Sequence, residues 1–286
     1  MDFIEKLLKA SLKNNSLLCI GLDPDPELMP DVEIAEFNRQ IIEATKDLVC
    51  AYKPNLAFYE ALGIDGLIAL EKTLRHIPGD IPVIADAKRG DIGNTARKYA
   101  QALFEIYGFD AATVNPYLGH DSLEPFMDYT DRGIFILCNT SNAGAADFQQ
   151  LRCRSDAAKD AVPLFELVAM KAAEWNVHRN IGLVVGATQP RSLRRVRQLC
   201  PDMSLLIPGI GAQGGELSSA VQYGVDANGE KAIINCSRQV LYASKGKDFP
   251  SAARLEAARL REQMNQQRFR VESLQSPAQP LMTSDW

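Results

Sequence analysis

Residues that build metal sites and disulfide frameworks are sparse in this sequence. Its 286 residues include only three histidines, His76, His120 and His178, which are far apart. The six cysteines are also scattered, form no Cys-x-x-Cys pair, and mostly lie in apolar runs where a small buried thiol is common. We therefore expect no zinc site, no disulfide framework and no Ser-His-Asp triad.

Long apolar runs and an excess of positive charge are missing too. No run of about 18 apolar residues occurs, and the N-terminal segment mixes acids and lysines among its apolar positions, unlike a signal peptide. Lysine and arginine number 31 against 36 acidic residues, which gives a net charge of −5. We expect a cytoplasmic protein that binds neither membranes nor nucleic acids.

Motifs for nucleotide cofactors are absent from the expected places. No G-x-G-x-x-G opens a helix after the first predicted strand, and no G-x-x-x-x-G-K-[ST] occurs. The sequence therefore predicts no cofactor. Hydrophobic residues at 46% and charged residues at 23% are ordinary for a globular chain that buries a core.

Short apolar segments alternate with amphipathic ones along the chain. Because the apolar segments do not alternate polar and apolar residues, both faces of each strand should be covered. The predicted strands are 17–23, 49–55, 81–88, 112–116, 134–141, 181–188, 204–211 and 231–237. The predicted helical stretches include 32–48, 57–76, 94–107, 155–175 and 190–199.

Eight such strand and helix units predict an α/β fold, a single-domain (β/α)₈ TIM barrel. We expect the barrel to span 15–268, with 1–14 as an N-terminal helix packed on it and 269–286 as a C-terminal tail that frays. A doubly wound open sheet is the alternative, because propensity alone does not count strands.

Polar residues return where the predicted strands end. They are Asp23, Lys53, Asp86, Lys88, Asn115, Thr140, Ser141, Gln189, Gln213 and Arg238. The opposite strand ends carry no comparable set. Because active sites of TIM barrels lie at the C-terminal ends of the strands, this asymmetry predicts a pocket there.

One of these strand ends carries an unusual density of charge. Strand alternation places Asp86 and Lys88 on one face, and Gly90 allows a turn just before Asp91. With Lys53 from the preceding strand, an alternating Lys-Asp-Lys-Asp array becomes possible, in which each charge stabilises its neighbours. The predicted array is a candidate catalytic centre.

Two other interpretations of these charges remain open. The array could be a buried structural ion-pair network without catalysis. Alternatively, Asp23, Asp86 and Asp91 could be ligands of Mg²⁺, although the interleaved lysines would compete with the cation.

A glycine-rich segment near the end of the predicted barrel is typical of an anion site. The sequence PGIGAQGG at 208–215 follows a strand and leads into a helical pattern, so its backbone N–H groups can surround a phosphate. The next strand ends in NCSR at 235–238, and Arg238 would supply a fixed positive charge. Turn glycines and a surface arginine are the alternative explanation. Together the two segments favour a phosphorylated ligand.

The charged segment also carries a family resemblance. DAKRGDI at 86–92 with Thr95 resembles the D-x-K-x-x-D-I-x-x-T signature of orotidine 5′-phosphate decarboxylases. Further matching segments follow in the family's order: GLD at 21–23, YKPN at 52–55, NPY at 115–117, TSN at 140–142, PGIGAQGG at 208–215 and NCSR at 235–238. The resemblance spans roughly residues 15–245 and is closest to the longer, bacterial-type subfamily (type 2).

The resemblance implies a reaction and a catalytic centre. Orotidine 5′-monophosphate would lose CO₂ to give UMP, the last step of de novo UMP synthesis, without a metal or organic cofactor. By position, Lys88 would protonate C6, Asp86 would lie near the leaving carboxylate, and Lys53 would hold the array and the ribose. The remaining catalytic position, Asp91, would reach the partner's site in a homodimer with shared active sites.

The resemblance also implies a set of substrate contacts. Asp23 would bind a ribose hydroxyl, Ser141 the pyrimidine amide edge, Gln213 the base and phosphate, and Arg238 the phosphate. Pro208 and Gly209 belong to the phosphate-binding segment, and Ile92 and Thr95 would accompany Asp91 into the partner's site.

Two other functions are compatible with the same residues. One is a Mg²⁺-dependent decarboxylase or aldolase of a related barrel that acts on a sugar phosphate. The other is a catalytically silent nucleotide-binding protein. The segment 142–160 matches the family least, and the sequence leaves open whether it is a lid or a plain insertion.

Overall fold

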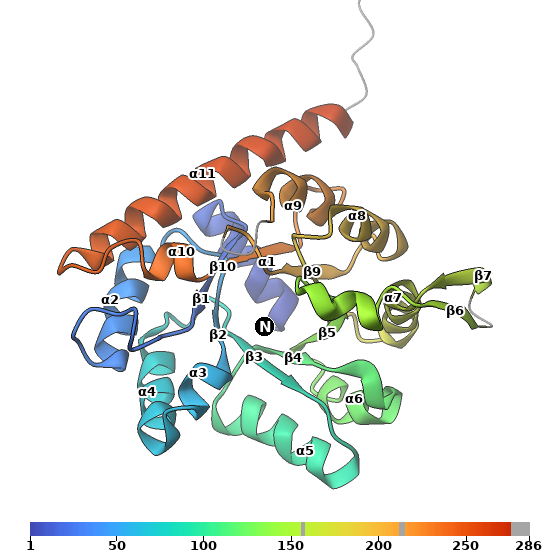
Figure 1. Ribbon diagram of the computed structural model, residues 1–286, viewed down its shortest axis with the longest axis horizontal. Helices are drawn as coiled ribbons and strands as arrows, with labels where there is room; N and C mark the ends of the chain where they lie inside the picture. Colours follow the sequence, from blue (N-terminus) through green and yellow to red (C-terminus); the bar gives the residue numbers. More distant parts are fainter. Residues whose placement is uncertain (156–157, 212–214, 276–286) are drawn as a thin grey trace, which may run out of the picture.

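The computed structural model describes residues 1–155, 158–211 and 215–275. Eight parallel strands form one sheet in the order β2-β1-β10-β9-β8-β5-β4-β3 (Figure 1). Bridges between Tyr52 and Val83 and between Asn55 and Asp86 join β2 to β3, the two strands at the ends of this order. The strands are β1 (Leu18–Leu22), β2 (Ala51–Pro54), β3 (Ile84–Arg89), β4 (Ala111–Val114), β5 (Gly133–Asn139), β8 (Ile181–Val185), β9 (Ser204–Ile207) and β10 (Ala232–Cys236). The sheet is therefore closed, which confirms the TIM barrel and all eight predicted strands and rules out the open sheet.

Strand alternation divides the apolar side chains between two cores. Inward-facing residues fill the barrel, with one from each strand: Cys19, Ala51, Ile84, Ala111, Phe135, Val184, Leu206 and Ile233. Their neighbours along the strands, such as Leu18, Ile20 and Ile234, pack outward against the helices. Because both faces are covered, the strands read as continuous apolar runs in the sequence.

Helices surround the barrel (Figure 1). The α-helices are α1 (Phe3–Asn14), α2 (Ile34–Thr45), α3 (Leu56–Glu60), α4 (Gly63–His76), α5 (Gly93–Gln101), α6 (His120–Met127), α7 (Leu164–Trp175), α8 (Pro190–Leu199), α9 (Leu217–Gly224), α10 (Arg238–Leu241) and α11 (Phe249–Gln275). Three short turns complete the set: a π-helical one, η1 (Ala102–Ile106), and two 3₁₀ ones, η2 (Pro116–Leu118) and η3 (Ala143–Asp147).

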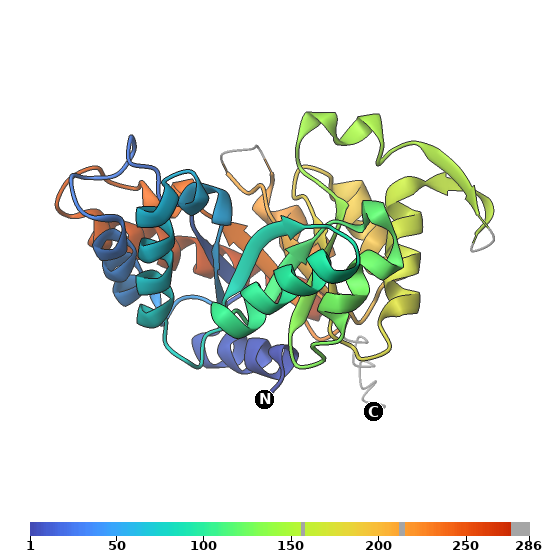
Figure 2. The ribbon, with the colours of Figure 1, turned by 90° about the horizontal axis from the view of Figure 1, so that it is seen from below.

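Two predicted helical stretches differ from the structure. The stretch 57–76 is interrupted, because the chain turns at Gly63, whose φ is 64°, and α3 and α4 are separate helices. The stretch 155–175 is wrong in its first part. There β7 (Ala158–Pro163) pairs antiparallel with β6 (Arg152–Ser155) in a hairpin that extends away from the barrel (Figure 2). Val162 precedes Pro163, and a proline disfavours helical backbone in the residue before it.

Helix α1 lies at the N-terminal end of the barrel, opposite η3 (Figure 2). The Phe3 ring packs edge-on against Phe135 at 5.6 Å between ring centroids. Lys6 Nζ lies 2.8 Å from both carboxylate oxygens of Asp110, which also accepts a hydrogen bond from the Val83 N–H. The side chains of Lys6 and Asp110 are each only 14% exposed, so this ion pair ties α1 to two strand starts.

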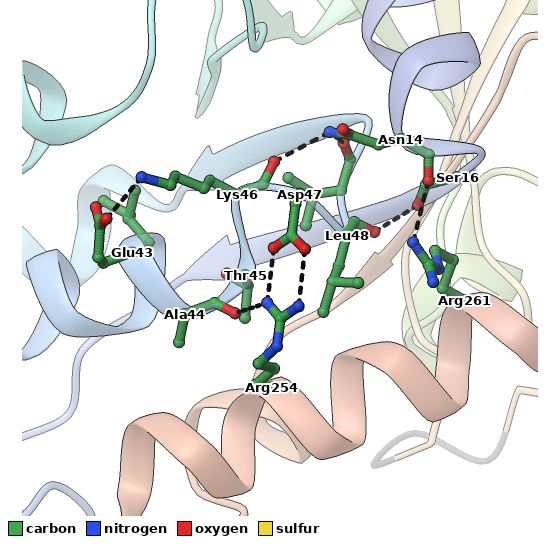
Figure 3. Close-up of polar contacts among 12 residues, drawn as sticks. Asn14, Ser16, Glu43, Ala44, Thr45, Lys46, Asp47, Leu48, Arg254 and Arg261 are labelled. Carbon is green, nitrogen blue, oxygen red and sulfur yellow. Dashed lines mark hydrogen bonds and ion pairs between the residues drawn. The ribbon is translucent and has the colours of Figure 1, made fainter.

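Helix α11 ties the end of the described chain to its beginning (Figure 3). Arg254 forms a two-pronged ion pair with Asp47, with N–O distances of 2.7 and 2.8 Å, and also donates to the Ala44 carbonyl. Arg261 donates to the Asn14 carbonyl. The side-chain amide of Asn14 in turn donates to the carbonyls of Lys46 and Val49 in the loop after α2. No helix within the described ranges is long and apolar enough to cross a membrane.

Candidate active site

A cavity of about 710 Å³ opens at the C-terminal ends of the strands. Of the site residues predicted from the sequence, it is lined by Asp23, Lys53, Asp86, Lys88, Ser141, Pro208, Gly209 and Arg238. These residues come from six different places in the chain but share one rim, as the barrel prediction required. Asn115 and Gln189 do not line it, and Asn115 instead accepts a hydrogen bond from the Tyr117 N–H.

The predicted charged array is assembled around Asp86. Lys53 Nζ lies 2.8 Å from Asp86 Oδ2, and Lys88 Nζ lies 2.5 Å from Asp86 Oδ1. The Lys53 side chain is 4% exposed and that of Asp86 13%, whereas the Lys88 side chain is 49% exposed and lines the cavity. The array thus places one buried cation, one buried anion and one accessible cation in line.

The charges hold one another ionised. Burial alone would raise the pKa of the Asp86 carboxyl, but the charges of Lys53 and Lys88 outweigh it and hold that pKa well below its usual range. Burial would lower the pKa of Lys53, but the carboxylates of Asp86 and Asp23 outweigh it, and this pKa is raised. At neutral pH, Asp86 and Lys53 therefore both carry full charge.

Thr113 on β4 holds the backbone that carries Lys88. Its hydroxyl oxygen accepts hydrogen bonds from the N–H groups of Ala87 and Lys88 at 3.0 and 2.9 Å, and its oxygen lies 3.2 Å from Asp86 Oδ1. Lys88 has a φ of 47°, a conformation that side chains other than glycine rarely adopt. Strain of this kind persists only where surrounding contacts impose it, and it is concentrated at functional sites.

The two ends of the cavity are built by different loops. On one side, Asp23 Oδ1 accepts a hydrogen bond from the Asn55 N–H at 3.2 Å, which fixes the carboxylate above β1 and β2. On the other side, Arg238 is the first residue of α10 and faces the cavity beside Pro208 and Gly209. Gly209 has a φ of 98°, so the chain turns there into the glycine-rich segment. Gln213 lies outside the described residues.

The Ser141 segment is held from two directions. A Cβ at Gly186 would lie 2.7 Å from the backbone N of Ser141, so only glycine allows this close approach. Thr188 Oγ1 donates to the Ser141 carbonyl at 3.1 Å. Gln149 accepts from the Thr140 N–H at 2.8 Å and so ties the segment after η3 to the end of β5.

Three predicted residues lie outside this cavity. Asp91, Ile92 and Thr95 do not line it, and Ile92 is 58% exposed at the start of α5. The Asp91 carboxylate accepts a hydrogen bond from the Ile92 N–H. Within one chain, these three residues therefore do not share the cavity with the array.

The structure adds cavity residues to which the sequence prediction gave no individual role: Asp25, Thr113, Phe148, Gln149, Asn235 and Tyr242. For Thr113 and Asn235 a signal was available, because each follows an inward-facing strand residue by two positions. Asn235 is 7% exposed and lies on the cavity wall. For Gln149 and Tyr242 the sequence holds no comparable signal, since both lie beyond the strand ends.

Comparison with known proteins relates this site to one family. Residues 16–248 match the family model described as "Orotidine 5'-phosphate decarboxylase / HUMPS family". The chain belongs to this family. It is 53% identical over 271 residues to an orotidine 5′-phosphate decarboxylase of Dehalococcoides mccartyi, covering 94% of this chain and 100% of the relative.

Two further relatives agree with the family match. The Cellvibrio japonicus relative of the same name is 52% identical over 277 residues, covering 93% of this chain and 98% of the relative. The solved structure of Leishmania donovani OMP decarboxylase is 41% identical, with a TM-score of 0.82, covering 94% of this chain and all of that chain. The family match extends from before β1 to after α10, so every element that lines the cavity lies within the decarboxylase region.

Proposed function

We propose that the chain converts orotidine 5′-monophosphate to UMP and CO₂, the last step of de novo UMP synthesis, through the charged array at the barrel rim. The observation that carries the proposal is the Lys53–Asp86–Lys88 array, with N–O distances of 2.8 and 2.5 Å, inside the one rim where the strand ends meet. The chain belongs to the orotidine 5′-phosphate decarboxylase / HUMPS family and is a carboxy-lyase.

Decarboxylation leaves a pair of electrons that the pyrimidine ring cannot delocalise. When the bond between C6 and the carboxylate breaks, CO₂ departs and the electron pair stays on C6. An ammonium group 3–4 Å away stabilises that charge by about 4 kcal/mol at an effective dielectric constant of 20. The accessible Lys88 Nζ supplies this charge, then donates its proton to C6 and regains one from solvent.

The other members of the array prepare Lys88 for this task. Asp86 fixes the ammonium through its Oδ1 and lies close to where the substrate carboxylate would bind, so that loss of CO₂ relieves repulsion between two anions. Lys53 neutralises Asp86 from the buried side through Oδ2. The charges are in place before substrate binds, so little reorganisation is needed during the reaction.

Binding of the remote phosphate supports the chemical step. Arg238 and the turn at Gly209 lie on the β9 and β10 side of the cavity, where TIM barrels commonly bind phosphate. Asp23 would hold a ribose hydroxyl and Ser141 the amide edge of the base. Binding energy from these groups can orient the reacting carbon against Lys88.

A Mg²⁺-dependent reaction on a sugar phosphate is less well supported by the geometry. Each oxygen of Asp86 already contacts a lysine ammonium, so a cation bound there would have to displace Lys53 or Lys88. The sequence-based alternative of Asp23, Asp86 and Asp91 as ligands also requires Asp91, which does not line the cavity.

Replacing the proposed proton donor tests the mechanism. Lys88→Ala should lower kcat by at least about 10³-fold, because both the charge beside C6 and the proton are removed. Affinity for UMP, measured by calorimetry, should change by less than about tenfold. Lys171→Ala is the matched control, since Lys171 is a partly exposed lysine paired with Glu174 on α7. Normal turnover by Lys88→Ala would refute the assignment of the proton donor.

We further propose a homodimer in which Asp91, Ile92 and Thr95 enter the active site of the partner subunit. The support is that these residues do not line their own cavity, while Ile92, Tyr117 and Leu118 expose apolar side chains after β3 and β4. Exposed apolar side chains that cluster at one rim are typical of an interaction surface. Asp91 would then complete the Lys-Asp-Lys-Asp order across the interface.

Mixing two inactive variants tests the shared site. Lys88→Ala and Asp91→Ala should each be inactive alone, because each site would lack one charged residue. A mixture should recover up to about a quarter of wild-type activity, because one of the two sites in a hybrid dimer receives both native residues. Subunit exchange is checked by native mass spectrometry with one variant isotope-labelled. Exchange without recovered activity would place Asp91 in its own subunit's site.

We also propose a cytoplasmic location. All six cysteines are unpaired, although Cys19 lies buried in β1 and Cys50 lies buried directly before the neighbouring strand β2, and free thiols of this kind are typical of a reducing compartment. The proposed substrate and product are nucleotides with charged phosphates, which do not cross a bilayer unaided.

A further inference from the structure

Two tyrosines hold the end of β1 and the loop that follows it. Tyr59 on α3 donates its hydroxyl hydrogen to the carbonyl of Leu22 at 2.9 Å. Tyr242, directly after α10, contacts the next part of the loop: its hydroxyl accepts from the Asp25 N–H at 2.7 Å and donates to the Asp23 carbonyl at 2.8 Å. A tyrosine hydroxyl has one hydrogen, so these two bonds define its orientation completely.

The same tyrosine is part of the helix that carries Arg238. The backbone N–H of Tyr242 donates to the carbonyl of Arg238 at 3.1 Å, which closes the short helix α10. Arg238 and Tyr242 both line the cavity, one turn apart. Tyr242 is thus bonded through its backbone N–H to Arg238, the proposed phosphate contact, and through its hydroxyl to the loop that carries Asp23.

Close packing between the two segments strengthens this connection. A Cβ at Gly21 would lie 2.0 Å from Ser237 Oγ, so β1 and the start of α10 approach each other as closely as glycine allows. The Tyr242 ring is stacked on Phe37 with centroids 6.2 Å apart. Burial raises the pKa of Tyr242 to about 12, so the hydroxyl keeps its hydrogen at neutral pH.

We propose that Tyr242 is a positioning residue that couples the phosphate end of the cavity to its ribose end. A phosphate bound to Arg238 would restrict the motion of α10. The hydrogen bonds of the Tyr242 hydroxyl would then restrict the motion of the loop that carries Asp23. Binding at each end then favours binding at the other, and the effect is reciprocal by thermodynamic linkage. This inference rests on the proposed function, which assigns the phosphate to Arg238 and the ribose to Asp23 and so makes UMP and uridine the ligands to use.

The coupling is measured first in the unaltered protein. Saturating inorganic phosphate should raise the affinity for uridine, measured by calorimetry, by about fivefold or more. Sodium chloride at equal ionic strength serves as the comparison for general salt effects. Failure of the wild-type protein to bind UMP would contradict the proposed function, whereas UMP binding with no effect of phosphate on uridine would overturn the coupling alone.

The variant Tyr242→Phe then assigns the coupling to the hydroxyl. This variant keeps the ring against Phe37. It should bind UMP about tenfold more weakly and uridine no more than about threefold more weakly. Added phosphate should no longer raise its affinity for uridine. Tyr129→Phe is the matched control, because the Tyr129 hydroxyl donates to Glu105 at 2.6 Å away from the cavity. Equal losses for UMP and uridine, or an unchanged effect of phosphate, would show that Tyr242 does not couple the two ends.

Discussion

At the scale of single residues, Asp86 is the carboxylate that joins the two lysines of the array. It has a lysine on each oxygen, and the Thr113 hydroxyl lies 3.2 Å from Oδ1. The spacing of Asp86 and Lys88 in the sequence predicted this contact through strand alternation. The left-handed backbone of Lys88 was not predictable from that pattern, because it depends on Thr113 from the next strand.

Removing the Asp86 charge should change stability in a pH-dependent way. At pH 6, Asp86→Asn should lower the free energy of unfolding by about 3 kcal/mol, because Lys53 stays buried without its anion. The folded-state pKa of Asp86 is depressed, so its contribution is present above the unfolded pKa of about 3.9 and is lost as pH falls through the folded value.

The difference between wild type and Asp86→Asn should therefore shrink below about pH 4. Urea unfolding at pH 6 and pH 3 measures it. Asp80→Asn serves as the control, since the ion pair of Asp80 with Lys13 lies on the surface and should contribute less than about 1 kcal/mol. A difference that grows toward pH 3 would contradict the assigned charge state of the array.

At the scale of elements, the two ends of the barrel have different tasks. The C-terminal ends carry the cavity, whereas the N-terminal ends are closed by α1 through Phe3 and the Lys6–Asp110 pair. Strands were predictable as short apolar runs that end in polar residues. The hairpin of β6 and β7 was not, because it stands apart from the barrel and its few residues carry no apolar period of their own.

A substitution at the N-terminal end should separate stability from activity. Lys6→Met should lower the free energy of unfolding by about 1–3 kcal/mol, because Asp110 loses its ion-pair partner in a largely buried position. It should leave kcat/KM within twofold, since α1 lies at the other end of the barrel. Lys13→Met is the control for an exposed pair and should change stability by less than about 1 kcal/mol. A large loss of kcat/KM in folded Lys6→Met would show that the two ends are coupled.

At the scale of the whole molecule, barrel closure converts residues spread along the chain into one rim. That step could be predicted from the number and character of the strands, and it explains why Asp23 and Arg238 line the same cavity. Loop contacts such as those of Gln149 and Tyr242 depend on the three-dimensional path of segments between elements, which apolar periodicity does not encode. The roles of Asp91, Ile92 and Thr95 concern a second subunit and stay a prediction.

The most direct measurement is the loss of ultraviolet absorbance of orotidine 5′-monophosphate on addition of the purified protein in EDTA. We predict rapid loss with wild type and none above background with Lys88→Ala, because the lysine array stabilises the C6 carbanion without a metal. Absence of any loss with folded, UMP-binding wild-type protein would contradict it, as would a reaction that begins only when Mg²⁺ is restored.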